Sequence, residues 1–281
     1  MKACRPLAAG SAVVALALLG WAVLVEPGRV RVRTIDLSLP GWPPALDGLR
    51  VAMMGDVHAG APHVGVDRLR ALVAEVNGTS PDVVVLLGDY VIHGVVGGRF
   101  VEPEITAEVL GGLRAPGGVV AVLGNHDWWY DGARVRRALE ARGIVVLENE
   151  AHSVVRAGNT FWLAGLADLW TRRPDLRVTL APIPSGAPVL LLTHSPDVFP
   201  QVPARVALTL AAHTHGGQVR IPPFPAPVVP SRYGSRYAAG HVIEGGRHLF
   251  VTTGVGTSII PVRFGVPPEV VILTLRPGRG Q

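Results

Sequence analysis

The stretch Leu49–His58, LRVAMMGDVH, joins a run of apolar residues to two side chains that can bind a metal. The apolar run has the composition of a strand that is buried on both faces, as in a parallel sheet. Asp56 and His58 stand two positions apart, so along an extended backbone both side chains would point to one side. The stretch therefore predicts a buried strand that ends in a candidate metal-binding loop.

Further loops downstream place Asp, Asn or His directly after a predicted buried strand. In chain order they are Gly88-Asp89, Gly124-Asn125-His126-Asp127, Thr193-His194 and His213-Thr214-His215, which Gly216-Gly217 follows. A single His beside a strand is more often structural than a ligand, and a Gly-Asp turn is common. Accident does not explain five strand ends that all carry such residues. If they meet at one edge of a sheet, they can build a two-metal centre, a device for hydrolysing phosphate esters.

Two regions with different patterns make up the rest of the predicted domain. In the first, helices predicted over 66–76, 103–113 and 132–142 alternate with strands over 49–54, 82–87 and 118–123. Such βαβαβ winding implies a parallel sheet covered on both faces. The second region begins with a hairpin around Gly158-Asn159 and continues with strands over 189–192, 206–211, 242–243, 248–252 and 270–275. We therefore expect one α/β domain over residues 49–276, a two-sheet sandwich flanked by helices.

The first 28 residues are expected to anchor the chain in a membrane. Leu7–Val25 contains no charged residue and is long enough to cross the roughly 30 Å hydrocarbon core as a helix. Trp21 stands near the far end of this run, where an interfacial aromatic residue is expected. A cleaved signal peptide and a buried helix of the domain are the alternatives. Arginines on both sides leave the orientation open. Residues 29–48 are expected to connect the anchor to the domain and to include an edge strand over 30–37.

Composition limits the class of protein and the kind of metal site. The chain has 281 residues, of which 48% are hydrophobic and 17% charged, which excludes a disordered chain and allows a sizeable core. The net charge of +5 comes from scattered arginines, because Lys2 is the only lysine, and this favours a solvated surface over nucleic-acid binding. Cys4 is the only cysteine, so a metal must be held by His, Asp and Asn. This ligand set suits Zn, Mn, Fe, Co or Ni better than Ca.

The order of the motifs closely resembles the calcineurin-like metallophosphoesterase superfamily. The matching motifs are Gly-Asp-x-His at 55–58, Gly-Asp at 88–89, Gly-Asn-His-Asp at 124–127, a single His at 194 and His-x-His at 213–215. The resemblance covers about residues 49–275 and implies a four-layer αββα sandwich with two divalent metal ions. The sequence departs from the family at Gly55, where many relatives carry Ser, and at Ala212, where relatives usually carry Gly.

The resemblance also implies a role for each matching residue. One metal ion would be held by Asp56, His58, Asp89 and His215. The other would be held by Asp89, which bridges the two ions, together with Asn125, His194 and His213. His126 would act as the general acid near the leaving-group oxygen, and Asp127 would orient its ring.

Downstream segments resemble a bacterial membrane-associated subgroup that includes phosphodiesterases and relatives of UDP-2,3-diacylglucosamine pyrophosphatase. These segments are Arg232-Tyr233-Gly234, Gly254–Ser258, Pro261–Gly265 and Pro268-Glu269. The implied reaction is hydrolysis of a phosphodiester or pyrophosphate bond by a metal-activated hydroxide, with a lipid-linked or nucleotide-sugar substrate, at the bacterial cell membrane. A non-catalytic membrane-tethered binding module and a nuclease are the alternatives. The first predicts lost ligands, and the second predicts a basic groove with aromatic residues.

An apolar, proline-rich loop follows the last ligands and bears on the substrate. Phe224, Val228 and Val229 either pack on the core of the domain or form an apolar wall for a lipid-linked substrate. The aromatic residues 128–130, directly after the predicted catalytic loop, have the same two interpretations.

Overall fold

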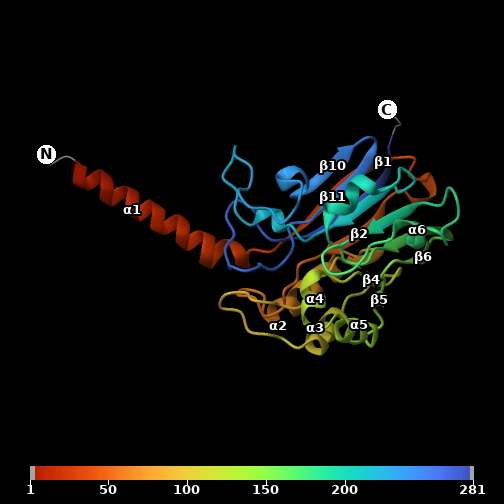
Figure 1. The fold of residues 1–281 in the computed structure, drawn as a ribbon, viewed down its shortest axis with the longest axis horizontal. Coiled ribbons are helices and arrows are strands. Elements are labelled where there is room, and N and C mark those ends of the chain that lie inside the picture. Colours follow the sequence, from red (N-terminus) through yellow and green to blue (C-terminus); the bar gives the residue numbers. More distant parts are fainter. Residues whose placement is uncertain (1–3, 279–281) are drawn as a thin grey trace.

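Two six-stranded sheets pack face to face at the centre of the protein (Figure 1). The structure is a computed structural model and describes residues 4–278. The strands of the first sheet, in spatial order, are β1 (Arg31–Pro40), β12 (Glu269–Gly278), β2 (Leu49–Met54), β3 (Val83–Leu86), β4 (Val119–Ala121) and β5 (Val145–Val146). Those of the second are β10 (Gly240–Glu244), β11 (Arg247–Val251), β9 (Leu208–Ala211), β8 (Val189–Leu192), β7 (Asn159–Gly165) and β6 (Glu150–Arg156).

Alternation of side chains along β2 shows how the layers are held together. Val51 and Met53 point between the sheets and belong to a core that also contains Leu190 and Leu192 of the second sheet. Ala52 and Met54 point to the other face of the sheet, into the core beneath the helices. Because a strand of this kind is buried on both faces, it needs an apolar residue at nearly every position. This explains the unbroken apolar runs in the sequence.

Helices cover the outer faces of both sheets. The first sheet is covered by α2 (Val66–Gly78), α3 (Pro103–Leu110) and α5 (Gly132–Glu140), which lie side by side in the lower part of Figure 1. The second sheet is covered by α6 (Leu176–Leu180) and by short 3₁₀ helices at Pro196–Gln201 and Gly234–Tyr237. The predicted αββα sandwich is confirmed. Its fourth layer is thin, and α6 and β5 were not predicted.

The N-terminal segment has two parts that differ in their contacts. Residues of α1 (Cys4–Gly20) form a helix that continues through Trp21–Val25 and Glu26–Gly28 and projects away from the body (Figure 1). The span Ser11–Gly28 has the length and apolar composition of a membrane-crossing helix, and 17% of it is buried. A buried helix of the domain, one of the alternatives, would have most of its residues buried instead. The connecting segment, the second part, contacts the domain: it forms β1, which pairs in parallel with β12 at the edge of the first sheet.

Candidate metal centre

The structure brings all seven predicted ligands into one buried cluster at the edge where β2, β3, β4, β8 and β9 end. They are Asp56, His58, Asp89, Asn125, His194, His213 and His215. Asp89 lies between the others, with Oδ2 at 3.2 Å from His194 Nε2 and at 3.7 Å from His58 Nε2. The sequence pattern therefore identified residues that the fold gathers around one carboxylate.

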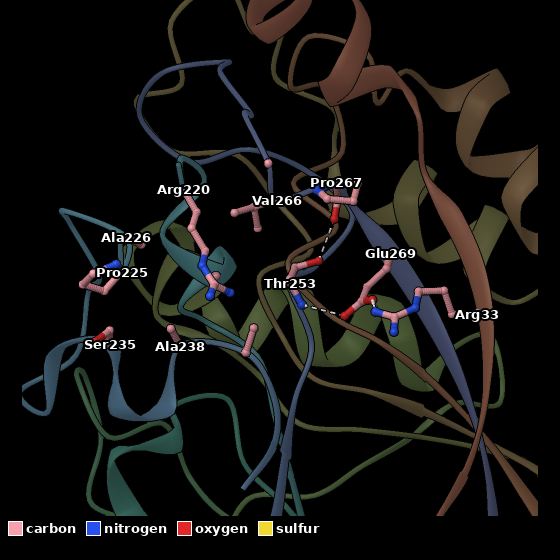
Figure 2. Close-up of a pocket in the computed structure, with 13 residues that line it drawn as sticks. Arg33, Arg220, Pro225, Ala226, Ser235, Ala238, Thr253, Val266, Pro267 and Glu269 are labelled. Carbon is pink, nitrogen blue, oxygen red and sulfur yellow. Dashed lines mark hydrogen bonds and ion pairs between the residues drawn. The ribbon is translucent and has the colours of Figure 1, made fainter. Parts of the chain in front are cut away.

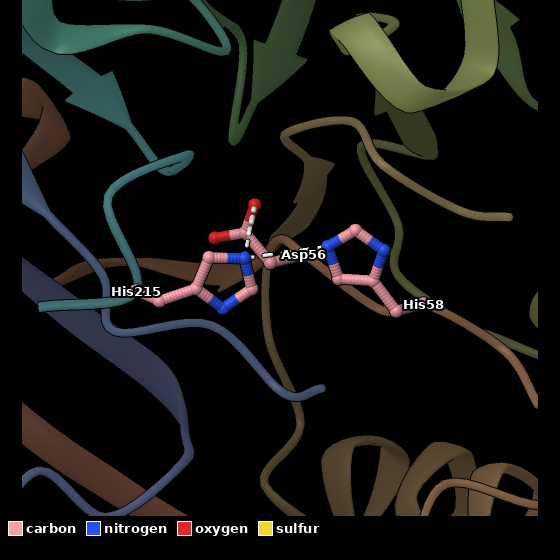
Figure 3. Close-up of side chains that lie close together, drawn as sticks. All are labelled: Asp56, His58 and His215. Atoms are coloured by element: carbon pink, nitrogen blue, oxygen red, sulfur yellow. Dashed lines mark hydrogen bonds and ion pairs between the residues drawn. The ribbon is translucent and has the colours of Figure 1, made fainter. Parts of the chain in front are cut away.

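The cluster consists of two groups of ligand atoms. In the first, Nε2 of His58 lies 3.3 Å from Nε2 of His215, which lies 3.7 Å from Oδ1 of Asp56 (Figure 3). In the second, His194 Nε2 lies 3.2 Å from His213 Nδ1 and beside Asp89. Ligand atoms within each group of three lie within 4.8 Å of one another, which is close enough to share one ion.

Asn125 and the backbone complete the second group. The Oδ1 atom of Asn125 lies 3.1 Å from His194 Nε2, so an amide oxygen joins the carboxylate and the two imidazoles. On its other side, Nδ1 of His194 lies 2.7 Å from the carbonyl oxygen of Leu87. A backbone carbonyl in this position holds the ring with Nε2 facing the cluster, as is common for metal-binding histidines.

Electrostatics of the cluster favour a bound cation. Burial lowers the pKa of His58 and of His213 to about 3, so both imidazoles are neutral, the form that binds metal. Burial and the neighbouring Asp89 raise the pKa of Asp56 to about 7, because both disfavour the charged form of its carboxyl group. Nε2 of His213 is also buried without a hydrogen-bond partner among the described residues. These residues therefore fit divalent metal ions.

His194 behaves differently from the other imidazoles. Burial opposes its protonation, but the charge of Asp89 and the hydrogen bond to it outweigh burial and raise the pKa of His194 to about 10. In the absence of another cation, the imidazolium itself balances Asp89. A metal ion bound by His194 has to displace this proton, which makes binding stronger as the pH rises.

Strained backbone supports a functional role for the cluster. Five of its residues have a positive φ, a region that residues other than glycine rarely adopt: Asp56 (48°), His58 (43°), Asp89 (57°), His213 (71°) and His215 (50°). The expectation that an extended backbone aligns Asp56 with His58 is therefore wrong, because the chain turns at each of them. Such conformations cost roughly 1–3 kcal/mol each and concentrate at functional sites.

Asp127 does not contact the His126 ring, contrary to its expected orienting role. Its Oδ2 accepts hydrogen bonds from the backbone N–H groups of Asp89 (2.8 Å) and Gly124 (2.9 Å). Its Oδ1 accepts from the N–H groups of Tyr90 (2.8 Å) and of the next residue (3.3 Å). These bonds occupy the carboxylate, so Asp127 fixes the loop that carries Asp89 rather than the imidazole.

His126 lies on α4 (Asn125–Tyr130), a short helix that was not predicted. Its backbone N–H donates to Oδ1 of Asp89 at 2.9 Å, so the start of this helix is tied to the central carboxylate. The ring lies edge-on to His58, with centroids 4.7 Å apart, and Nδ1 has no hydrogen-bond partner among the described residues. The His126 side chain also lines the pocket that opens onto the cluster.

A pocket of about 450 Å³ opens onto the cluster and has largely apolar walls. Trp129 and Trp170 stand on its sides, and Val228 and Ile259 contribute from loops. The Trp170 ring lies 4.9 Å from that of His213. Of these residues, Trp129 and Val228 were predicted as candidate wall residues, whereas Trp170 and Ile259 were not singled out. Both lie in irregular loops, where no periodicity or motif marks them.

A fully buried arginine that the sequence analysis did not single out as a site residue supports the cluster from behind. The Arg263 guanidinium donates to the carbonyl oxygens of Thr253 (2.7 Å) and Val266 (3.2 Å) and also to Gly256. These bonds hold the 253–256 turn against Asp56. The turn lies so close that a Cβ atom at Gly254 would be 2.6 Å from the Cβ of Asp56. Arg263 thus positions one of the candidate ligands.

The two departures from the family pattern lie against each other. A Cβ atom at position 55 would lie 2.6 Å from the Cβ of Ala212, closer than two carbons can approach. Ala212 itself does not have a positive φ. Gly55 therefore makes the room that Ala212 occupies.

We expect Gly55→Ser to lower the free energy of unfolding by about 1–3 kcal/mol through overpacking. Combining it with Ala212→Gly is expected to restore most of the loss, because the clash is removed. Urea denaturation of the two single variants and the double variant measures this coupling. Strict additivity of the two single effects would contradict the packing described.

The chain belongs to the calcineurin-like phosphoesterase family. A family model with that description matches residues 49–217, more than half of the chain. The chain is 30% identical to an uncharacterized metallophosphoesterase of Bacillus subtilis, over 92% of this chain and 89% of that protein. It is 33% identical to a phosphodiesterase of Escherichia coli, over 69% of this chain and 70% of that protein. A transmembrane protein with a metallophosphoesterase domain from Danio rerio is 29% identical, over 93% of this chain and 62% of that protein.

Proposed function

We propose that this protein is a membrane-anchored phosphoesterase that hydrolyses a phosphodiester or pyrophosphate bond with two divalent metal ions. The observation that carries the proposal is the pair of buried ligand groups around Asp89. Asp56, His58, Asp89 and His215 would hold one ion, and Asp89, Asn125, His194 and His213 the other. Mn, Zn, Fe, Co and Ni suit this set. When bound, the ions would supply positive charge at the phosphate and acidify a water molecule.

His126 is the residue we assign to proton transfer. It lines the pocket beside Trp129, with ring centroids 4.8 Å apart, and its backbone is held by Asp89. From this position the ring would donate a proton to the departing oxygen, a contribution of typically 10²- to 10⁴-fold. Asp127 would act indirectly by holding the Asp89 loop in its strained conformation.

Apolar pocket walls favour a lipid-linked substrate over nucleic acid. Among the described residues, the lining contains no Arg or Lys, whereas a nuclease needs a basic groove along the nucleic-acid backbone. The α1 span and the transmembrane relative support a single-pass N-terminal anchor, which we place in a bacterial cell membrane. All seven ligand positions carry a residue that can bind a metal ion, which argues against a non-catalytic binding module.

The metal-loaded full-length protein in detergent should be assayed with a phosphomonoester, a phosphodiester, a nucleotide-sugar pyrophosphate, a phospholipid and an oligonucleotide. We expect chelator-sensitive cleavage of the diester, the pyrophosphate or the phospholipid. Fastest cleavage of the oligonucleotide would support the nuclease alternative. If none is cleaved although metal is bound, the binding-module alternative is favoured.

A further inference from the structure

We propose that three loops around the pocket form a docking face for an anionic lipid bilayer, so that the pocket opens against the membrane. The docking face consists of residues 94–98, 221–228 and 258–260. These loops lie at the end of the body from which α1 projects (Figure 1). The inference rests on the proposed membrane anchor and phosphoesterase function, and it adds where the pocket faces and what covers it.

Exposed apolar side chains concentrate on this face. They are Val96 (61% exposed), Ile221 (59%), Phe224 (68%), Val228 (73%), Ile259 (67%) and Ile260 (49%). Phe224 and Val228 therefore do not pack on the core, which was one of the two interpretations of their loop. Large exposed apolar groupings mark contact surfaces for membranes or proteins.

Hydrogen bonds join the three loops into one surface. The N–H of Val96 donates to the carbonyl of Ile259 at 2.9 Å. The Gln218 side chain, at the base of the 221–228 loop, donates to the carbonyls of Ser258 (3.2 Å) and Ile260 (3.3 Å). Val228 and Ile259 both line the pocket described above, so the docking face surrounds its mouth.

The helical segment that continues α1, residues 21–28, is fixed next to the same surface. The Arg263 N–H donates to the carbonyl of Ala22 at 2.9 Å, and the Val266 N–H donates to Oε1 of Glu26 at 3.0 Å. Oε2 of this buried Glu26 accepts from Nε1 of Trp21. The end of the apolar helix therefore has a fixed position relative to the loops, and a membrane that contains α1 would lie next to them.

Ile259 has an unusual backbone conformation within the docking face. It is β-branched and has a φ of 61°, a combination that is a genuine outlier. Its side chain is nevertheless exposed, so packing within the protein does not offset the strain. The hydrogen bond from Val96 N–H to the Ile259 carbonyl holds this backbone, so the isoleucine side chain is directed outward at the docking face.

Positive charge beside the docking face favours anionic headgroups. A cavity of about 370 Å³ behind the 221–228 loop is lined by Arg33 and Arg220. Glu269 pairs with Arg33 at 2.8 Å, so Arg220 supplies the net positive charge of this cavity (Figure 2). Arg29 lies over the ring of Trp21, 5.2 Å from its centroid, just beyond the helical segment that continues α1. Tryptophan and arginine at the end of an apolar helix are typical of the membrane interface. Basic residues near anionic lipids add about 1 kcal/mol each.

Fluorescence of single labels tests the docking face without relying on activity. In a Cys4→Ser background, Val96→Cys and Phe224→Cys carry a polarity-sensitive dye, and Val155→Cys is the matched control. Val155 is 62% exposed, nearly the same as Val96, but lies on β6. In full-length protein reconstituted in phosphatidylcholine–phosphatidylglycerol vesicles, we expect a blue shift and quenching by spin-labelled lipids at 96 and 224, and neither at 155. Labels at 96 and 224 that report a water environment would overturn the proposal. A protein partner would then be the better explanation of the exposed apolar side chains.

Activity provides the second arm of the test. Phe224→Asp is expected to lower hydrolysis of a vesicle-embedded phospholipid by about tenfold or more, because apolar area at the interface is lost. Hydrolysis of a water-soluble ester is expected to stay unchanged, since Phe224 does not line the pocket. Val155→Asp should change neither. An equal loss on both substrates with Phe224→Asp would overturn the docking role. If no substrate is cleaved, the proposed function fails while the fluorescence arm still decides this inference.

Discussion

Replacing Asp89 with alanine is expected to abolish metal binding and phosphoesterase activity together. Asp89 Oδ2 lies 3.2 Å from His194 Nε2 and 3.7 Å from His58 Nε2, so its carboxylate lies beside ligand atoms of both groups. Its removal leaves the His194 imidazolium without its counter-charge and takes from both ligand groups the oxygen atom that they share. Loss of the several kcal/mol that bound metal contributes to the transition state predicts a fall in kcat/KM of about 10³-fold or more.

Asp197→Asn provides a control for removing a buried carboxylate. Asp197 accepts hydrogen bonds from Ser231 and Arg232 and lies outside the cluster, so this variant should keep metal and activity. Elemental analysis and thermal unfolding of both variants separate metal loss from unfolding. A folded Asp89→Ala protein that retains two ions per chain would show that the assignment of Asp89 is wrong.

His126→Ala is expected to keep its metal and to lose turnover. The expected loss is about 10²- to 10⁴-fold for alkyl esters, whose leaving groups need a proton, and much smaller for nitrophenyl esters, whose leaving groups do not. His126 also lies within ligand distance of His58 and Asp89, so metal content has to be measured beside the kinetics. His241→Ala, a histidine on β10, is the control.

Two outcomes would contradict the role of His126 in different ways. Wild-type turnover of alkyl esters by His126→Ala would rule it out as the general acid. Loss of one metal ion from His126→Ala would instead identify it as a ligand. The leaving-group dependence therefore has to appear in protein with full metal content.

Strands and long helices could be predicted because the positions of their apolar residues along the chain indicate which faces are buried. The apolar run in Leu49–Met54 reads as a strand buried on both faces, and the spacing of Leu69, Leu72 and Val76 reads as one face of α2. α4 and α6 were missed because they are six and five residues long, too short for a helical period to show. β5, with two residues, is likewise too short to detect.

Candidate ligands could be predicted for a different reason. Asp, His and Asn after buried strands are visible as sequence, and parallel winding brings strand ends together. The role of Asp127 could not be seen, because three of its four hydrogen-bond donors lie 36 to 38 residues earlier in the chain. Nor could that of Arg263, since arginine is rarely buried and its acceptors are backbone carbonyls that carry no sequence signal.

Metal stoichiometry against activity tests the central claim most directly. Metal-free full-length protein is titrated with Mn²⁺ or Zn²⁺ while bound metal and phosphodiester hydrolysis are measured in the same samples. Two buried ligand groups that share Asp89 predict two equivalents per chain at saturation, with activity that follows occupancy of both sites. Full activity of the metal-free protein, or saturation of binding and activity at one equivalent, would contradict the two-metal centre.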